Sequence, residues 1–188
     1  SSPLLLLFAG ITIMEPWLYR NLLTSDNIEN IQQKDFKIIA HKGASGIAPE
    51  NTLASFQAAL DIGVDIIELD VRQTKDEEII VFHDQFLDRT TNGMGNVHEY
   101  TLEQLKHVDA GSWFSSKFSD QKIPTLKEVL DLVDGRCQVL IEIKHMDHPH
   151  YHDFSDKLVD VIRLEENGFD WVLLLSLIHI SEPTRRRG

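Results

Sequence analysis

Short apolar runs alternate with amphipathic segments from residue 37 onward. The apolar runs predict strands at Lys37–His41, Asp65–Val71, Glu78–His83, Cys137–Ile143 and Asp170–Leu175. Apolar residues that recur every three or four positions predict helices at Thr52–Ile62 and Phe154–Glu166. Capping boxes at Thr101–Gln104 and Thr125–Glu128 mark the starts of two more helices. Such interleaving is typical of a parallel sheet covered on both faces, which leaves a doubly wound sheet and a (β/α)8 barrel as candidates.

The first 35 residues do not follow this alternation. Leu4–Met14 is almost wholly apolar and is followed by Trp17, Tyr19 and Arg20, a combination typical of the exit end of a transmembrane helix. The run is shorter than the roughly 20 residues that a spanning helix needs, so a helix packed on the domain surface is the alternative. We therefore expect residues 1–35 to be an apolar segment and a linker, in a protein that is membrane-anchored or otherwise cytoplasmic.

The other end of the chain also departs from the pattern. Ser176–Gly188 turns abruptly basic, and its Ile-His-Ile-Ser-Glu-Pro-Thr-Arg run resembles the translation of a sequencing adapter. We expect residues 176–188 to be a non-native tail, with a natural solvated tail as the alternative. The folded domain is then residues 36–175, and it is cut near its last predicted strand.

Composition narrows the class of ligand. A length of 188 residues predicts about one domain, and the formal net charge of −12 argues against nucleic acid, because no basic patch lies outside the last few residues. An overall negative field also repels anions, so a phosphate ligand would need local cations or a metal. The lone cysteine, Cys137, excludes an internal disulfide.

Charged side chains gather where the predicted strands end. The four pairs at these ends are His41/Lys42, Glu68/Asp70, His83/Asp84 and Glu142/Lys144. Because the carboxyl ends of parallel strands meet at one edge, we expect these groups to converge there. Alternation along a strand puts Glu68 and Asp70 on one face, where carboxylates need a metal such as Mg²⁺ or Ca²⁺, or a salt bridge with a cation such as Arg72.

Three carboxylates, two histidines and two lysines in one place form a site for metal-assisted cleavage of a phosphate ester. The metal would neutralise a non-bridging oxygen, and the lysines would bind the remaining negative charge. Histidine titrates near neutral pH, so the two imidazoles can pass protons to and from opposite oxygens.

The chain resembles a known family in several motifs. They are H-K-G-A-S-G-x-A-P-E-N-T, I-E-L-D-V, V-F-H-D-x-x-L-D-R-T-T-N-G-x-G, D-A-G-S-W-F, I-P-T-L-x-E-V-L and I-E-I-K. Together they are similar to the glycerophosphodiester phosphodiesterase domain over Phe36–Leu175. The resemblance implies a (β/α)8 TIM barrel of the phospholipase-C-like type, here incomplete with about five of its strands, and a small insertion after the strand that carries His83.

The resemblance also implies roles for individual residues. It assigns His41 and His83 as the acid–base pair, Glu68, Asp70 and Glu142 as ligands of Ca²⁺ or Mg²⁺, Lys42 and Lys144 as phosphate-binding residues, and Glu50 and Asn51 as supports of the first loop. The family usually has arginine at position 42. Lys42 keeps the charge but loses the bidentate geometry, so weaker positioning of the phosphate is expected.

The implied reaction is hydrolysis of a glycerophosphodiester to glycerol 3-phosphate and an alcohol, in phospholipid and glycerol metabolism. We expect His41 to deprotonate the attacking hydroxyl, which belongs to water or to the substrate's own glycerol, and His83 to protonate the leaving alcohol. Two alternatives stay open. One is a lysophospholipase D-like enzyme on the same barrel, whose lipid substrate would suit an N-terminal segment in contact with a membrane, and the other is an inactive truncated fragment or binding module.

Overall fold

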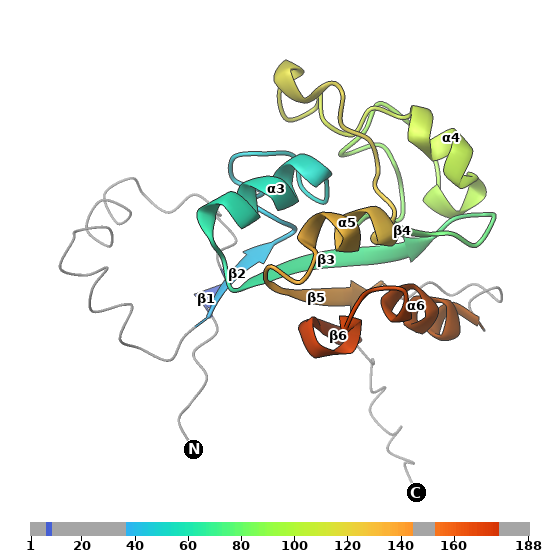
Figure 1. Cartoon of the computed structure of the whole chain (residues 1–188). Helices are drawn as coiled ribbons and strands as arrows, with labels where there is room; N and C mark the ends of the chain where they lie inside the picture. The colour runs from blue at the N-terminus through green and yellow to red at the C-terminus, as the bar shows by residue number, and fades with distance from the viewer. Residues whose placement is uncertain (1–6, 9–36, 145–152, 177–188) are drawn as a thin grey trace, which may run out of the picture.

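The computed structural model describes residues 7–8, 37–144 and 153–176, and Figure 1 shows their arrangement. The strands are β1 (Leu7–Phe8), β2 (Ile38–His41), β3 (Ile66–Gln73), β4 (Ile79–Val81), β5 (Gln138–Ile143) and β6 (Val172–Ser176). The helices are α3 (Leu53–Ile62), α4 (Leu102–His107), α5 (Leu126–Val133), α6 (Phe154–Arg163) and α7 (Gly168–Trp171), with short 3-10 helices η1 (Val97–Glu99) and η2 (Ser116–Phe118).

One sheet organises the described residues. Its order is β1-β2-β3-β5-β6, with each neighbouring pair parallel, and β4 pairs with β3 alone. The prediction that Glu78–His83 forms another parallel strand is wrong, because β4 is shorter and runs antiparallel to β3, with Val81 opposite Val71. The link 74–78 is far shorter than the dozen or more residues that a parallel crossover needs, so the chain turns back as a hairpin.

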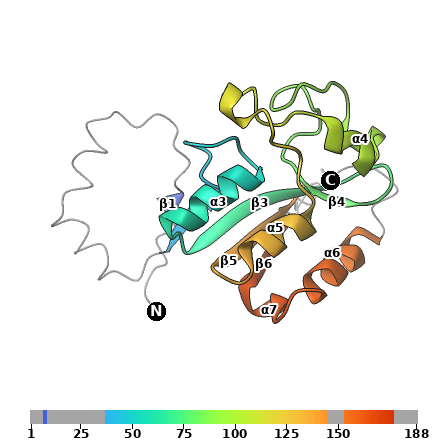
Figure 2. The same cartoon turned by 45° about the horizontal axis from the view of Figure 1, so that its top comes forward.

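A single layer of helices covers the sheet among the described residues. Helix α5 packs between α3 and α6, and the same succession is visible in Figure 2. Phe56, Leu130 and Leu158 of these helices are buried against Ile67 and Ile141 of the sheet. Helices on one face are typical of a barrel wall and not of a doubly wound sheet, so the structure confirms the (β/α)8 class for the part that it describes.

Local signals account for most helix boundaries. Thr101 and Thr125 cap α4 and α5 in capping boxes, as the sequence predicts. Helix α6 ends at Arg163 rather than near Glu166, and α7 forms where the fifth predicted strand was expected to begin. Asn167 adopts a left-handed conformation (φ 53°) before α7, so the strand starts only after that extra turn.

The terminal predictions fall largely outside the described residues. Within the apolar run Leu4–Met14, only Leu7–Phe8 is described, and it forms a strand beside β2 instead of part of a helix. No helix in the described ranges is long and apolar enough to cross a membrane. The tail lies outside the described residues beyond Ser176.

Candidate active site

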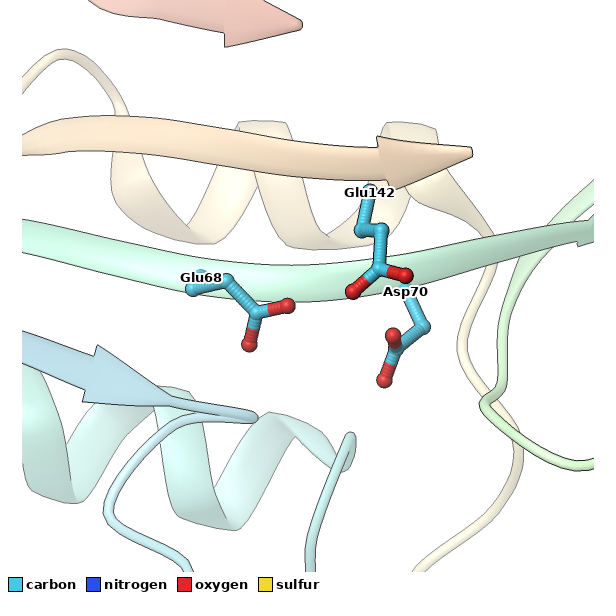
Figure 3. A group of neighbouring side chains, drawn as sticks. All are labelled: Glu68, Asp70 and Glu142. Carbon is cyan, nitrogen blue, oxygen red and sulfur yellow. The ribbon is translucent and has the colours of Figure 1, made fainter. Parts of the chain in front are cut away.

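Three carboxylates come together on the face of the sheet away from the helices, and we call them the acidic cluster. Ile67, Leu69 and Val71 of β3 belong to the core with the helices, so the alternating Glu68 and Asp70 point the other way. Glu142 of β5 is the register partner of Asp70. A carboxylate oxygen of each of the three residues lies within 4.8 Å of the others, and Figure 3 shows all three side chains on one side of the two strands.

The acidic cluster carries more negative charge than its neighbours neutralise. Glu68 is 3% exposed and Asp70 is 0% exposed. Burial, together with the charges of Asp70 and Glu142, raises the pKa of Glu68 to about 7. The Nζ atom of Lys144 lies 3.0 Å from Asp70 Oδ1 and 2.5 Å from Glu142 Oε1, so it is the nearest described cation.

A divalent cation fits this environment. The Oδ1 atom of Asp70 is buried and has no hydrogen-bond partner, although the Lys144 ammonium forms an ion pair with it. Closely spaced, buried carboxylate oxygens are the ligands that Mg²⁺ and Ca²⁺ prefer, and a cation would satisfy the oxygen of Asp70 that has no donor. Within residues 37–144 and 153–176, the Lys144 ammonium pairs with two of the three carboxylates, so the salt-bridge alternative does not by itself balance their charge.

The loop after β2 places His41 beside the acidic cluster. Lys42 (φ 58°) and Gly43 (φ 77°) are both left-handed, and this turn lets the Lys42 N–H donate to Glu68 Oε2 at 2.9 Å. A Cβ at Gly43 would lie 2.4 Å from Ser55 Oγ, so only glycine fits there. The Nε2 atom of His41 lies 3.8 Å from Glu68 Oε2. Burial, followed by the charge of Lys42, lowers the pKa of His41.

The same loop is braced by the two residues that the sequence assigns to its support. The Asn51 amide donates to Asp70 Oδ2 at 2.9 Å, and the Asn51 N–H donates to the Lys42 carbonyl at 3.1 Å. Glu50 accepts a hydrogen bond from Lys42 Nζ at 3.1 Å. Lys42 is thus largely buried in an ion pair with Glu50 and does not line the pocket described next.

His83 reaches the site from the opposite direction, because β4 runs back along β3. The Phe82 N–H donates to the Asp70 carbonyl at 2.9 Å, which places the next residue beside the acidic cluster. His83 Nδ1 lies 2.5 Å from Asp84 Oδ1. A pocket of about 630 Å³ opens here, lined by His83 and Lys144 together with Arg72, Phe86 and Arg89.

The sequence indicates other roles for two arginines at this pocket, Arg72 as a salt-bridge partner and Arg89 as a residue that fixes the turn of the insertion, and it misses their contacts here. Arg72 was considered only as a salt-bridge partner, but its Nε donates to the His83 carbonyl at 2.8 Å. Its position on the same face of β3 as Glu68 and Asp70 is the signal that could have found it. Arg89 donates to both Asp84 and Glu50, and no local pattern in the sequence indicates that connection.

The fold and this site together define a class: a β/α-barrel protein with an acidic, histidine-flanked site at the carboxyl ends of its strands. The family model for the glycerophosphoryl diester phosphodiesterase family matches residues 41–171. The chain belongs to this family.

Individual relatives agree with this assignment. A glycerophosphodiester phosphodiesterase of Caldanaerobacter subterraneus subsp. tengcongensis is 46% identical over 145 residues, which is 77% of this chain and 59% of the relative. One from Bacillus subtilis is 42% identical over 147 residues, 74% of this chain and 47% of the relative. The chain therefore spans roughly half the length of these curated relatives.

Solved structures extend the comparison to the fold. A glycerophosphodiester phosphodiesterase from Agrobacterium tumefaciens is 37% identical with a TM-score of 0.68. An Oleispira antarctica phosphodiesterase, solved in complex with its product sn-glycerol-3-phosphate, is 34% identical with a TM-score of 0.71. Each match covers 76% of this chain and 58% of the other.

Proposed function

We propose that the protein is a metal-dependent phosphodiesterase that hydrolyses glycerophosphodiesters to glycerol 3-phosphate and an alcohol, in phospholipid and glycerol metabolism. The observation that carries the proposal is the acidic cluster with His41 beside it and a pocket walled by His83 and Lys144. The Oleispira antarctica relative with bound sn-glycerol-3-phosphate supports the same substrate class. No described residue favours the lysophospholipase D-like alternative.

Glu68, Asp70 and Glu142 would hold the divalent cation, Ca²⁺ or Mg²⁺. When bound, it would supply positive charge that stabilises the developing charge on phosphate oxygens. Lys144 lies between the acidic cluster and the pocket, so its ammonium is placed to contact a phosphate. Lys42 would favour phosphate binding through its positive charge and not through direct contact, because its Nζ binds Glu50.

His41 would act as the base. Its lowered pKa keeps the imidazole neutral at physiological pH, so a ring nitrogen can accept a proton from the attacking hydroxyl. That hydroxyl belongs to water or to the glycerol of the substrate.

His83 would act as the acid. Because Asp84 accepts from its Nδ1, the Nε2 atom is left for the substrate and can deliver a proton to the leaving alcohol. Lysophospholipids, and a membrane contact through the N-terminal apolar segment, stay predictions of the sequence.

Release of glycerol 3-phosphate from a panel of glycerophosphodiesters, with and without chelator, tests the proposal. We expect the 188-residue chain to release it, to lose activity in chelator and to recover with Ca²⁺ or Mg²⁺. Glu142→Gln should abolish release, whereas Asp160→Asn, at an exposed carboxylate far along the chain, should not. Release that is insensitive to chelator would contradict the metal, and a folded chain with no release would favour the inactive-fragment alternative.

A further inference from the structure

Arg89 joins the two loops that carry the site histidines. Its Nε donates to Asp84 Oδ2 at 2.5 Å and its Nη2 donates to Asp84 Oδ1 at 3.1 Å. On the other side, Nη1 donates to Glu50 Oε2 at 2.9 Å and Nη2 donates to Glu50 Oε1 at 2.7 Å. Asp84 follows His83, and Glu50 lies on the loop that begins at His41. We call Arg89 and these two carboxylates the arginine clamp.

The arginine clamp occupies its guanidinium almost completely. A guanidinium has five N–H donors, and the contacts to Glu50 and Asp84 use four of them. Although Arg89 lines the pocket, it has little capacity left to bind a phosphate. Two bidentate pairs instead fix the relative positions of two carboxylates. The geometry therefore favours a role in holding the site together over direct contact with substrate.

The effect of the arginine clamp reaches His83 through Asp84. The hydrogen bond from Arg89, together with the one from His83, lowers the pKa of Asp84 to about 2. Asp84 is ionised at neutral pH even at its ordinary pKa of 3.8, so what Arg89 adds is the fixed position of this carboxylate beside His83. An ionised acceptor 2.5 Å from Nδ1 requires the proton to sit on that nitrogen. With Nδ1–H bonded to Asp84, Nε2 is the nitrogen left for the substrate, and it carries a proton only in the imidazolium, which is the form in which His83 would act as the acid.

We propose that Arg89 is a positioning residue: by holding Asp84 and Glu50 together, it fixes His83 as the Nδ1–H tautomer and sets its ring orientation. The catalytic consequence rests on the function proposed above, but the tautomer does not. Both are therefore measured separately.

The first experiment measures the tautomer without any turnover. Long-range ¹H–¹⁵N spectra of the 188-residue chain labelled in histidine identify the protonated nitrogen of each ring, and His83→Ala assigns the signal. We expect His83 to be protonated at Nδ1 in the unsubstituted chain and to become a mixture of both tautomers in Arg89→Gln. Arg89→Lys should be intermediate, because one ammonium cannot bind two carboxylates bidentately.

Arg163→Gln is the matched control, since Arg163 forms an exposed ion pair with Asp160 on α6, away from the two loops. It should leave the His83 signal unchanged. If Arg89→Gln does not fold, as judged by circular dichroism, Arg89→Lys and Glu50→Gln decide the question. An unchanged Nδ1–H signal in the folded clamp variants, with a changed signal in Asp84→Asn, overturns the proposal.

The second experiment compares two leaving groups. Arg89→Gln should lower kcat for a glycerophosphodiester with an alkyl alcohol by about 10- to 100-fold, part of the usual contribution of a general acid. For a nitrophenyl diester, whose leaving group needs no proton, the loss should be under about 3-fold. Equal losses on both substrates would assign Arg89 a merely structural role. A shifted tautomer in a chain that turns over neither substrate would leave the positioning role standing and remove the proposed function.

Discussion

The acidic cluster and the arginine clamp are both networks of charged side chains, but they differ in balance and in support. The acidic cluster has three carboxylates for one ammonium, is largely buried, and stands on two adjacent strands. The arginine clamp has two carboxylates for one guanidinium, with the Lys42 ammonium as a further partner of Glu50, and it spans two loops. Its Arg89 side chain is about half exposed, whereas Asp84 and Glu50 are mostly buried. Excess charge on rigid strands is suited to receiving a cation, whereas balanced charge between loops is suited to fixing geometry.

The largest effect is expected from removing one ligand of the acidic cluster. Asp70→Asn takes away a fully buried charge at its centre, so affinity for Ca²⁺ and Mg²⁺ should fall by at least about 100-fold. Isothermal titration calorimetry on the chelator-treated chain measures this. Asp160→Asn, an exposed carboxylate, is the control, and equal affinities in the two variants would refute the cation site.

A second prediction tests whether the ionised Glu68 carboxylate destabilises the folded, metal-free chain. Between pH 4.5 and about 7 the folded state keeps a proton on Glu68 that the unfolded state releases, so the free energy of unfolding of the metal-free chain falls as pH rises through this window. Glu68→Gln should lack this fall and be more stable than the unsubstituted chain by about 2 kcal/mol at pH 8.

Urea unfolding in chelator at a series of pH values measures the Glu68 effect. The glutamine introduced by this substitution would keep an oxygen for the Lys42 N–H, so that contact is not lost. Glu166→Gln, at an exposed position, is the matched control. A destabilised Glu68→Gln at pH 8 would show that the carboxylate is compensated in the metal-free state.

In the arginine clamp, we expect a favourable coupling between Arg89 and Glu50 that is smaller than the effect of Glu68→Gln. In a double-mutant cycle of Arg89→Gln with Glu50→Gln, we expect a coupling free energy of about 1 kcal/mol, reduced by solvent because Arg89 is 47% exposed. Urea unfolding of the four proteins measures it. Strictly additive losses would show that the bidentate pair holds neither loop.

The smallest effect concerns Asp84 in acid. Its pKa is about 2 in the folded state and 3.8 when unperturbed, so the stability that it contributes is complete above about pH 4 and is lost as pH falls through 2. The stability difference between Asp84→Asn and the unsubstituted chain should be under about 1 kcal/mol and shrink from about pH 5 to about pH 2.5. A constant difference over that range, measured by urea unfolding, would argue against an ionised Asp84.

Most of the acidic cluster could be predicted from the sequence. Alternation along one strand puts Glu68 and Asp70 on the same face, and the structure has them there. That Glu142 lies opposite Asp70 depends on β5 being the parallel neighbour of β3, which no local pattern specifies. The sequence predicts only that these strand ends converge at one edge, and the family resemblance adds Glu142 as a ligand; the structure brings the three carboxylates together.

The sequence predicts His83 at the site, but it assumes the wrong strand direction. His83 was placed at the carboxyl end of a parallel strand, but it follows a strand that runs antiparallel to β3. The shortness of the link after β3 was a usable sign of a hairpin, since a crossover does not fit in it. Arg89 was out of reach, because its contact with Glu50 joins residues 39 positions apart through two irregular loops.

The β3–β4 hairpin has a consequence for how this family can diversify. The hairpin returns the chain along β3 before α4 begins, and Figure 1 shows α4 above the end of β3, apart from α3 and α5. The segment 85–123 is tied to the rest of the domain at several points, because Arg89 binds Glu50, the Tyr100 carbonyl accepts from the Lys75 N–H, and Lys106 pairs with Glu128. An exchange of residues 85–123 between homologues should therefore keep the domain folded only where the incoming segment also supplies partners for Glu50, Lys75 and Glu128.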